Sequence, residues 1–252
     1  MKVEEYENIF RNEESHFFYV ANHRIVLSLI EKFKTGGKKV RILDAGCGTG
    51  LLAKKLKKYG EVLGTDISDE ALKFARKRKV NAKKASITEL PFPKNNFDIV
   101  TCIDVINHRW VKNDQKALNE LKRVLKTKGL LIIRASANSW LSLLHDKHVY
   151  LKKRYGRSEF QAKLLKAGFT IKKISFLNML LLPLAFVQSL LEKYRKTKNP
   201  SSAIENVNPL LNLLLTLLLS LEALILPYFN LPFGIALIAV CVKPKHNSDI
   251  TK

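Results

Sequence analysis

The segment that most constrains the fold is an apolar run that ends in an acidic residue and passes directly into three alternate glycines. Residues 40–50 read Val-Arg-Ile-Leu-Asp-Ala-Gly-Cys-Gly-Thr-Gly. The run is typical of a buried parallel strand, and the glycines predict a turn where backbone can approach a ligand because no Cβ intervenes. A helix is expected to begin at Leu51. A dinucleotide-binding fingerprint would have its third glycine at this position, so the glycine spacing differs from that fingerprint. The pattern also fits a strand–turn–helix corner that needs small residues and binds nothing.

A second short apolar strand also ends in an acidic residue. Residues 61–68 read Glu-Val-Leu-Gly-Thr-Asp-Ile-Ser, which puts Asp66 20 residues after Gly46. A doubly wound sheet has at this place the carboxylate that accepts hydrogen bonds from two ribose hydroxyls. A carboxylate suits a diol because both of its oxygens are acceptors. Alternatively, Asp66 caps a helix that begins near Ser68, but two such strand ends together favour a nucleoside-binding site.

Strand and helix patterns alternate as far as residue 135 and return near the C-terminus. Apolar runs predict a fourth strand within 96–104, a fifth at 128–133, a sixth at 168–176 and a seventh at 235–242, and residues 118–126 form an amphipathic helical pattern. This order predicts a parallel sheet with helices on both faces.

These features together resemble the class I S-adenosylmethionine-dependent methyltransferases. The spacing of Gly46, Gly48 and Gly50 after Asp44 is similar to motif I, and residues 90–100 are similar to the LPF…FDxV stretch of that family. The resemblance covers roughly residues 10–176 and returns at 231–243. It implies a Rossmann-like, doubly wound α/β sheet of seven strands, mostly parallel with the last strand antiparallel. It also implies S-adenosylmethionine as the methyl donor.

The resemblance further implies a set of donor-binding residues near the strand ends: Asp44, Ala45, Gly46, Cys47, Gly48, Gly50, Asp66, Ile67, Ser86, Ile87, Ile103 and Asp104. One position departs from the family pattern. Members often have an acid four residues before the Leu-Pro-Phe to receive the adenine amino group, and this chain has Ser86. Either Ser86 accepts a weaker bond or the backbone of Ile87 takes this role.

Residues 13–24, before an apolar helix expected over 25–33, resemble a leader found in a subset of small methyltransferases. The leader has the pattern Glu-x-His, three aromatic residues and then Arg, with His16 and Arg24 at its fixed positions. There it folds over the donor as a lid. Aromatic rings would exclude water, and Arg24 would pair with the methionine carboxylate. The alternative is an amphipathic helix whose aromatic side chains pack on the flank of the domain.

A long insert precedes the last strand. Residues 177–234 contain two apolar segments, 179–191 and 210–226. The second would reach only about 25 Å as a helix, short of the roughly 30 Å hydrocarbon core of a bilayer, and it contains Glu222 and a polar strip of Asn212, Thr216 and Ser220. We therefore expect an interfacial hairpin or an apolar cap over the acceptor pocket. Packing onto the domain and a homodimer contact are the alternatives.

The formal net charge of +22 favours anionic partners, either an anionic membrane surface or nucleic acid. The alternative is a solvated lysine-rich surface with no such partner. The three cysteines lie in or beside predicted strands, without the spacing of metal ligands, so we expect no metal site. The N-terminus shows no secretory leader pattern, so a cytoplasmic location is expected, with peripheral attachment to the inner face of the membrane as the alternative.

Three residues are candidates for catalysis. His108 follows the fourth strand, and His145 precedes Asp146, whose carboxylate could orient the imidazole and raise its basicity. The region 145–155 is similar to an HD…(H)xRRY element of some methyltransferases, although Leu151 stands where the second His is expected. Arg154 and Tyr155 alternatively anchor the next helix.

The sequence therefore predicts a single methyltransferase domain over residues 1–252. Its parts are a helical lid (1–37), a donor-binding core (38–176), an apolar helical insert (177–234) and the last strand (235–243). The acceptor is predicted to be an apolar, lipid-like or membrane-associated small molecule. The alternatives are an RNA or protein methyltransferase that uses the basic surface, and a non-catalytic donor-binding partner subunit.

Overall fold

One seven-stranded sheet organises the residues that the computed structural model describes, which are 3–34, 40–141, 146, 149–194 and 207–245. The strand order is β3-β2-β1-β4-β5-β7-β6. The strands are β1 (Val40–Ala45), β2 (Gly60–Asp66), β3 (Asn81–Lys84), β4 (Phe97–Ile103), β5 (Leu125–Ser136), β6 (Thr170–Leu177) and β7 (Ala236–Val242).

The sheet is mixed, because only β7 runs against its two neighbours. β1 pairs in parallel with β2, from Val40 opposite Gly60 to Ala45 opposite Thr65. β7 lies antiparallel between β5 and β6. The predicted fold class, a Rossmann-like sheet that is mostly parallel with an antiparallel last strand, is confirmed. The carboxyl ends of β1, β2, β4 and β5 consequently meet at one edge of the sheet.

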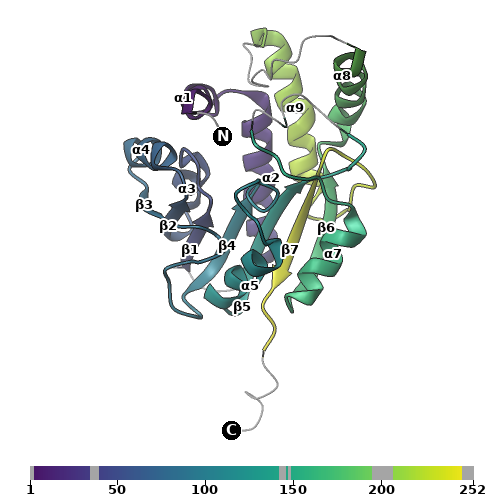
Figure 1. Cartoon of the computed structure of the whole chain (residues 1–252). Coiled ribbons are helices and arrows are strands. Elements are labelled where there is room, and N and C mark those ends of the chain that lie inside the picture. The colour runs from purple at the N-terminus through teal and green to yellow at the C-terminus, as the bar shows by residue number, and fades with distance from the viewer. Residues whose placement is uncertain (1–2, 35–39, 142–145, 147–148, 195–206, 246–252) are drawn as a thin grey trace.

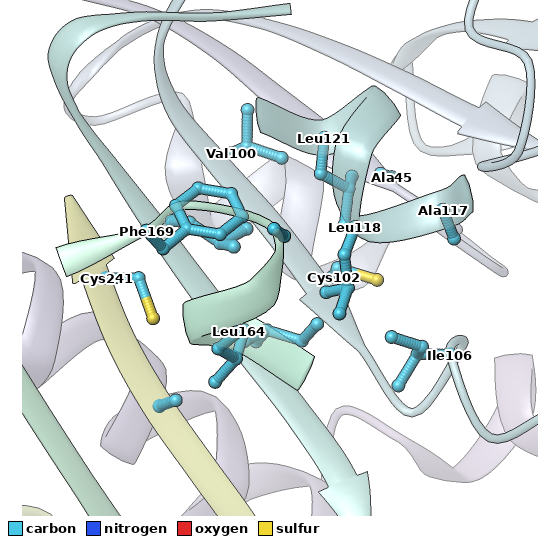
Figure 2. Close-up of a cluster of buried hydrophobic side chains, with 14 of the residues drawn as sticks. Ala45, Val100, Cys102, Ile106, Ala117, Leu118, Leu121, Leu164, Phe169 and Cys241 are labelled. Atoms are coloured by element: carbon cyan, nitrogen blue, oxygen red, sulfur yellow. The ribbon is translucent and has the colours of Figure 1, made fainter. Parts of the chain in front are cut away.

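Helices cover both faces of the sheet (Figure 1). One hydrophobic cluster packs α5 (Asp114–Val124) and α7 (Arg157–Lys166) on one face, and part of it is drawn in Figure 2. The other cluster packs α2 (Phe17–Phe33) and α3 (Leu51–Leu56), with Ala75 of α4 (Asp69–Lys77), on the opposite face. The central strands have apolar residues on both faces, as expected of a covered parallel sheet.

Short polar residues set where these helices begin. Ser68 caps α4 by accepting a hydrogen bond from the backbone N–H of Ala71 (3.3 Å), and Asn113 caps α5 by accepting one from Lys116 (2.9 Å). α2 begins at Phe17, with His16 as its cap, and not at Ile25 as expected from its apolar run. The aromatic leader is therefore part of this helix.

The insert forms two helices beyond the carboxyl edge of the sheet, with a short 3-10 turn (Met179–Leu181) leading into α8 (Leu182–Tyr194) and later α9 (Pro209–Ile225). Figure 1 shows α9 beside α2, with α1 (Val3–Asn12) on the other side of α2. No helix within the described ranges combines the length and the apolarity needed to cross a membrane.

Candidate active site

A cavity of about 620 Å³ lies at the carboxyl ends of β1, β2, β4 and β5. Its floor is formed by the loops that follow these strands, and its cover by α1, the start of α2 and side chains of the insert. A volume of this size is typical of a small-molecule site. The cavity is lined by most of the sequence-predicted donor residues: His16, Asp44, Gly46, Cys47, Gly48, Asp66, Ile67, Ser86, Ile87, Ile103 and Asp104.

The glycine loop after β1 adopts a backbone that favours glycine. Gly46, Gly48 and Gly50 all have positive φ, at 84°, 53° and 86°. A Cβ on Gly46 would lie 2.2 Å from a methyl carbon of Val105, so this glycine allows close packing. A Cβ on Gly48 would meet no protein atom within 4 Å, and Gly48 lines the cavity. Its missing side chain therefore leaves room for a ligand.

Two predicted residues of this loop do not line the cavity. Ala45 is fully buried in the core below it, and Gly50 is the cap residue of α3. Both residues support the conformation of the loop but do not line the cavity, so neither is placed to contact a donor directly.

Asp66 ends β2 and holds the glycine loop. Its carboxylate accepts hydrogen bonds from the backbone N–H groups of Gly48 and Ser68, both at 2.9 Å. Burial raises the pKa of Asp66 above its ordinary value, although these backbone bonds oppose the shift. The carboxylate also borders the cavity, where its remaining lone pairs can accept hydrogen bonds from a diol.

Asp44 ends β1 and is almost completely buried. One carboxylate oxygen accepts a hydrogen bond from the Thr101 hydroxyl at 2.7 Å, and the other has no partner. Burial raises the pKa of Asp44 to about 6, with a smaller contribution from the charge of Asp66. The unpartnered oxygen marks a position where a ligand's donor group would be stabilised.

Ser86 and Ile87 border the cavity on the side of β2 and β3. The Ser86 hydroxyl lies 2.8 Å from the Thr88 hydroxyl and also accepts a hydrogen bond from the Thr88 backbone N–H. Ile67, which is about half exposed, lies on the same side. This wall is therefore mainly apolar, with one hydroxyl already engaged within the protein.

Of the two predicted lid residues, His16 and Arg24, only His16 lies at the cavity. His16 lines it, stacks on Phe17 with ring centroids 4.5 Å apart, and has a buried Nε2 without a partner. Burial lowers the pKa of His16. Arg24 points elsewhere: it is exposed, and its guanidinium donates to the Ser220 hydroxyl of α9 at 2.7 Å.

Arg134 of β5 is the cation that the structure brings to the cavity instead. It is buried, forms an ion pair with Asp104 at 2.6 Å, and lies over the ring of Phe18. Its Nε has no partner. Sequence reasoning missed this residue, although an arginine directly after the apolar run 130–133 was a usable signal.

A buried ion pair fastens the N-terminal segment to the glycine loop. Glu13 accepts hydrogen bonds from the Thr49 hydroxyl and from Arg78. Arg78 also donates to the backbone oxygens of Thr49 and Phe10, each at 3.0 Å. Burial raises the pKa of Glu13, and the bonds to Thr49 and Arg78 oppose this shift. α1 is thereby held against α4, and Tyr6 of α1 reaches the cavity.

Two of the three catalytic candidates, His108 and Asp146, line the cavity. His108 lines the cavity beside Trp110, and burial lowers its pKa to about 4. Asp146 also lines the cavity, but its carboxylate forms a bidentate pair with Arg154, at 2.7 and 3.0 Å. His145 lies outside the described residues. Among the residues that are described, no group of His, Cys, Asp and Glu is placed to hold a metal ion.

Buried polar atoms without partners concentrate at this cavity. Besides the atoms of His16, Asp44 and Arg134, they include Oδ1 of Asn22 and Oδ1 of Asn107. Buried polar groups are normally hydrogen-bonded, so this concentration indicates a site made for a polar ligand. The donor and acceptor atoms fit the amino and carboxylate groups of S-adenosylmethionine, and the space beside Gly48 fits its nucleoside.

Comparison with known proteins gives a consistent result. A family model described as "Methyltransferase domain" matches residues 43–133. An uncharacterized protein of Methanocaldococcus jannaschii is 33% identical over 149 residues, which are 59% of this chain and 70% of that protein. A ubiquinone biosynthesis O-methyltransferase of Rickettsia bellii is 35% identical over 147 residues, 52% of this chain and 59% of the relative. The chain spans less than two thirds of the length of the other curated relatives, between 38% and 59% for five of them.

The fold is also that of solved methyltransferase structures. A chain in the complex between the Haloferax volcanii Trm112 methyltransferase activator and a methyltransferase matches with a TM-score of 0.62 at 17% identity. The match covers 97% of this chain and 95% of the other. At this identity the likeness concerns the fold alone.

Proposed function

The chain belongs to the class I S-adenosylmethionine-dependent methyltransferases, and from this premise we propose that it methylates an apolar, lipid-like small molecule. S-adenosylmethionine brings an activated methyl group together with its own leaving group. The protein therefore needs chiefly to align the two reactants and exclude water. Asp66 and the Gly48 backbone would hold the nucleoside, and Asp44, His16 and Arg134, which also line the cavity, would hold the amino acid part.

The observation that carries the proposal is the composition of the remaining cavity wall. Beyond the glycine loop the lining passes to Leu181 and Leu184, with Ala185 and Leu215, all from the insert. Trp110, Val149 and Leu151 also line the cavity. A mainly apolar wall with few polar groups favours an apolar acceptor. The R. bellii relative is named for ubiquinone biosynthesis, and an apolar acceptor for this chain agrees with that name.

His108 is our candidate for a proton acceptor. Burial lowers its pKa to about 4, which keeps the imidazole neutral at neutral pH but also makes it a weak base, so it would take the proton only as the acceptor hydroxyl becomes acidic on gaining the methyl group. Asp146 has a different proposed role. Its bidentate bond to Arg154, which also donates to the backbone oxygen of Ala137, would hold the wall in place.

The decisive experiment supplies tritiated S-adenosylmethionine to the protein together with separate lipid, RNA and protein fractions. We expect label in the fraction extracted by organic solvent. Label in RNA or protein would instead support an enzyme that uses the basic surface. Donor binding without label in any fraction would support a non-catalytic subunit.

A further inference from the structure

Helix α9 has its polar side turned inward and its apolar side turned outward. Asn212 exchanges hydrogen bonds with the start of α2: its side-chain oxygen accepts from the Phe17 N–H (2.8 Å), and its amide donates to the Ser15 oxygen (2.9 Å). Ser220 accepts from Arg24. Glu222 is buried and accepts from the backbone N–H groups of Asn178 and Met179. The polar strip therefore serves as the attachment of α9 to the domain.

The outward face of α9 consists of exposed leucines: Leu210, Leu213, Leu214, Leu217, Leu221 and Leu224. A helix on the surface of a water-soluble domain normally shows the opposite arrangement. α8 also presents apolar side chains to solvent, since Leu184, Val187 and Leu191 are each about half exposed or more. In Figure 1 both helices stand beyond the edge of the sheet, away from the C-terminus. An apolar surface of this extent indicates an interaction site.

We propose that the outer face of α8 and α9 docks on an anionic lipid bilayer, from which the acceptor enters the cavity. That the acceptor enters from the bilayer rests on the proposed function, whereas the docking of α8 and α9 on the bilayer does not. The described part of α9 has only one charged residue, Glu222, and it faces inward. The outward face of α9 itself has only apolar side chains, so it needs no hydrogen-bonding partner and matches hydrocarbon, whereas the centre of a protein interface ordinarily includes hydrogen-bonding groups.

The positive charge of the protein favours a bilayer that contains anionic lipids. The formal net charge is +22, and basic side chains flank α9 on its α2 side: Arg24 is exposed, and Lys32 lies over the ring of the exposed Tyr228. Positive charge beside an inserted apolar face attracts anionic headgroups, and shallow insertion requires no spanning helix.

The same two helices also form the acceptor wall of the cavity. Leu181 lies just before α8, Leu184 lies in the first turn of α8, and Leu215 lies on α9. α9 runs in the same direction as α2, with Asn212 beside Phe17 and Ser220 beside Arg24. Its first turns therefore lie next to the aromatic residues that border the cavity. A surface seated on a bilayer would place this wall near the acyl region.

Flotation with vesicles tests the docking step. Wild type, the variant Leu217→Glu with Leu224→Glu, and the control Leu165→Glu would be mixed with phosphatidylcholine vesicles with and without phosphatidylglycerol. Leu165 on α7 is 51% exposed and Leu217 is 55% exposed, so the control matches the size and accessibility of the change. Circular dichroism verifies that each protein is folded, and titration with S-adenosylhomocysteine shows whether the nucleoside site is intact.

At about 0.1 M salt we expect wild type and the control to float more with the vesicles that contain phosphatidylglycerol than with phosphatidylcholine alone; equal flotation would contradict the preference for an anionic bilayer. Part of the binding should persist at about 0.5 M salt, because salt screens surface charge but does not weaken leucine insertion. The double variant should partition at least tenfold less, because withdrawing one leucine from hydrocarbon already costs roughly a factor of ten. Its nucleoside titration should be unchanged.

The proposal is overturned if folded wild type stays with the aqueous phase, or if the double variant floats as well as wild type. It is also overturned if light scattering shows a dimer that the double variant abolishes, since a second copy would then cover this face. Failure of methyl transfer in a protein that floats would contradict the proposed function and leave docking intact.

Discussion

Asp44 and Asp66 end neighbouring strands but lie in different environments. Asp66 accepts two backbone hydrogen bonds at the cavity edge, whereas Asp44 is buried with one bonded and one free oxygen. Two roles follow from these surroundings. Asp66 would present a hydrogen-bonded carboxylate to a diol, and the backbone bonds oppose the rise that burial causes in its pKa, whereas burial raises the pKa of Asp44 to about 6.

Replacing Asp66 with alanine should lower the affinity for S-adenosylmethionine at least tenfold. The change removes acceptors for ribose hydroxyls, and each hydrogen bond to a charged group contributes about 1.5–3 kcal/mol. Calorimetric titration measures the effect. Asp69→Ala is the matched control, because Asp69 is the next acid along the chain and forms only an exposed ion pair with Lys84. Equal affinities for the two variants would contradict the assignment of Asp66.

Asp44→Asn should stabilise the ligand-free protein at neutral pH. The folded-state pKa of Asp44 is raised from 3.8 to about 6, so its contribution to stability is fully present below pH 3.8 and is lost as pH rises through 6. The loss is about 3 kcal/mol, at 1.36 kcal/mol for each pKa unit. Asparagine stays neutral and can keep the bond from Thr101.

Urea unfolding of wild type and Asp44→Asn between about pH 4 and 7 checks this expectation. The difference in free energy of unfolding should widen in favour of the variant as pH rises, and then level off above the folded-state pKa. A difference independent of pH would show that Asp44 ionises normally in the folded protein.

At the residue scale, sequence reasoning succeeded where backbone chemistry dictates the residue type. The three glycines, Asp44 and Asp66 follow from strand ends and a tight turn, and all of them except Gly50 border the cavity. The cation was predicted less well. Arg24 has the expected spacing, but α2 turns it toward Ser220, while Arg134 reaches the cavity from β5. The packing of α9 on α2 places Arg24, and the strand β5 places Arg134, and neither can be read from residue spacing.

At the element scale, α1 is held by the buried pair of Glu13 and Arg78. Arg78→Ala would leave the Glu13 carboxylate buried without its cation, and breaking a buried pair in this way costs about 3–5 kcal/mol. Because the pair joins α1 to α4 and the glycine loop, we expect α1 to open locally. Donor affinity should fall as well, since α1 covers the cavity.

Hydrogen exchange of the segment 3–13 measures this opening. It should become faster in Arg78→Ala and stay unchanged in Arg76→Ala, which removes an exposed arginine two residues away. Faster exchange spread equally over the sheet would show that the pair supports global stability and not the attachment of α1.

Elements with a clear apolar pattern were predicted well, and those without one were not. β3 reads Asn-Ala-Lys-Lys and is mostly exposed at the sheet edge, so no alternation of apolar residues marks it. The polar strip of α9 was recognised, but its direction was not, because a helical pattern alone does not say which side faces the protein. Hydrogen bonds to α2 and Glu222 determine that direction.

At the scale of the whole molecule, one cavity joins parts that are far apart in the chain. The strand ends supply its floor, α1 and α2 its cover, and the insert part of its wall, through Leu181, Leu184, Ala185, Gln188 and Leu215. A ligand that fills this cavity therefore connects the N-terminal helices, the sheet and the insert. Binding should accordingly stabilise the fold as a unit, and the stability of the whole chain becomes a measure of site occupancy.

S-adenosylhomocysteine at 100 times its dissociation constant should stabilise the protein by about 2.7 kcal/mol, because it binds only the folded state. For a chain of this length, that corresponds to a rise in Tm of roughly 5–10 °C. Thermal unfolding at increasing ligand concentration measures the shift, which should grow with the logarithm of concentration. Asp66→Ala should need at least ten times more ligand for the same shift, and Asp69→Ala should behave as wild type. A Tm that does not respond to the ligand would mean that the cavity at the strand ends does not bind the donor's product, and the assignment of the site would fall with it.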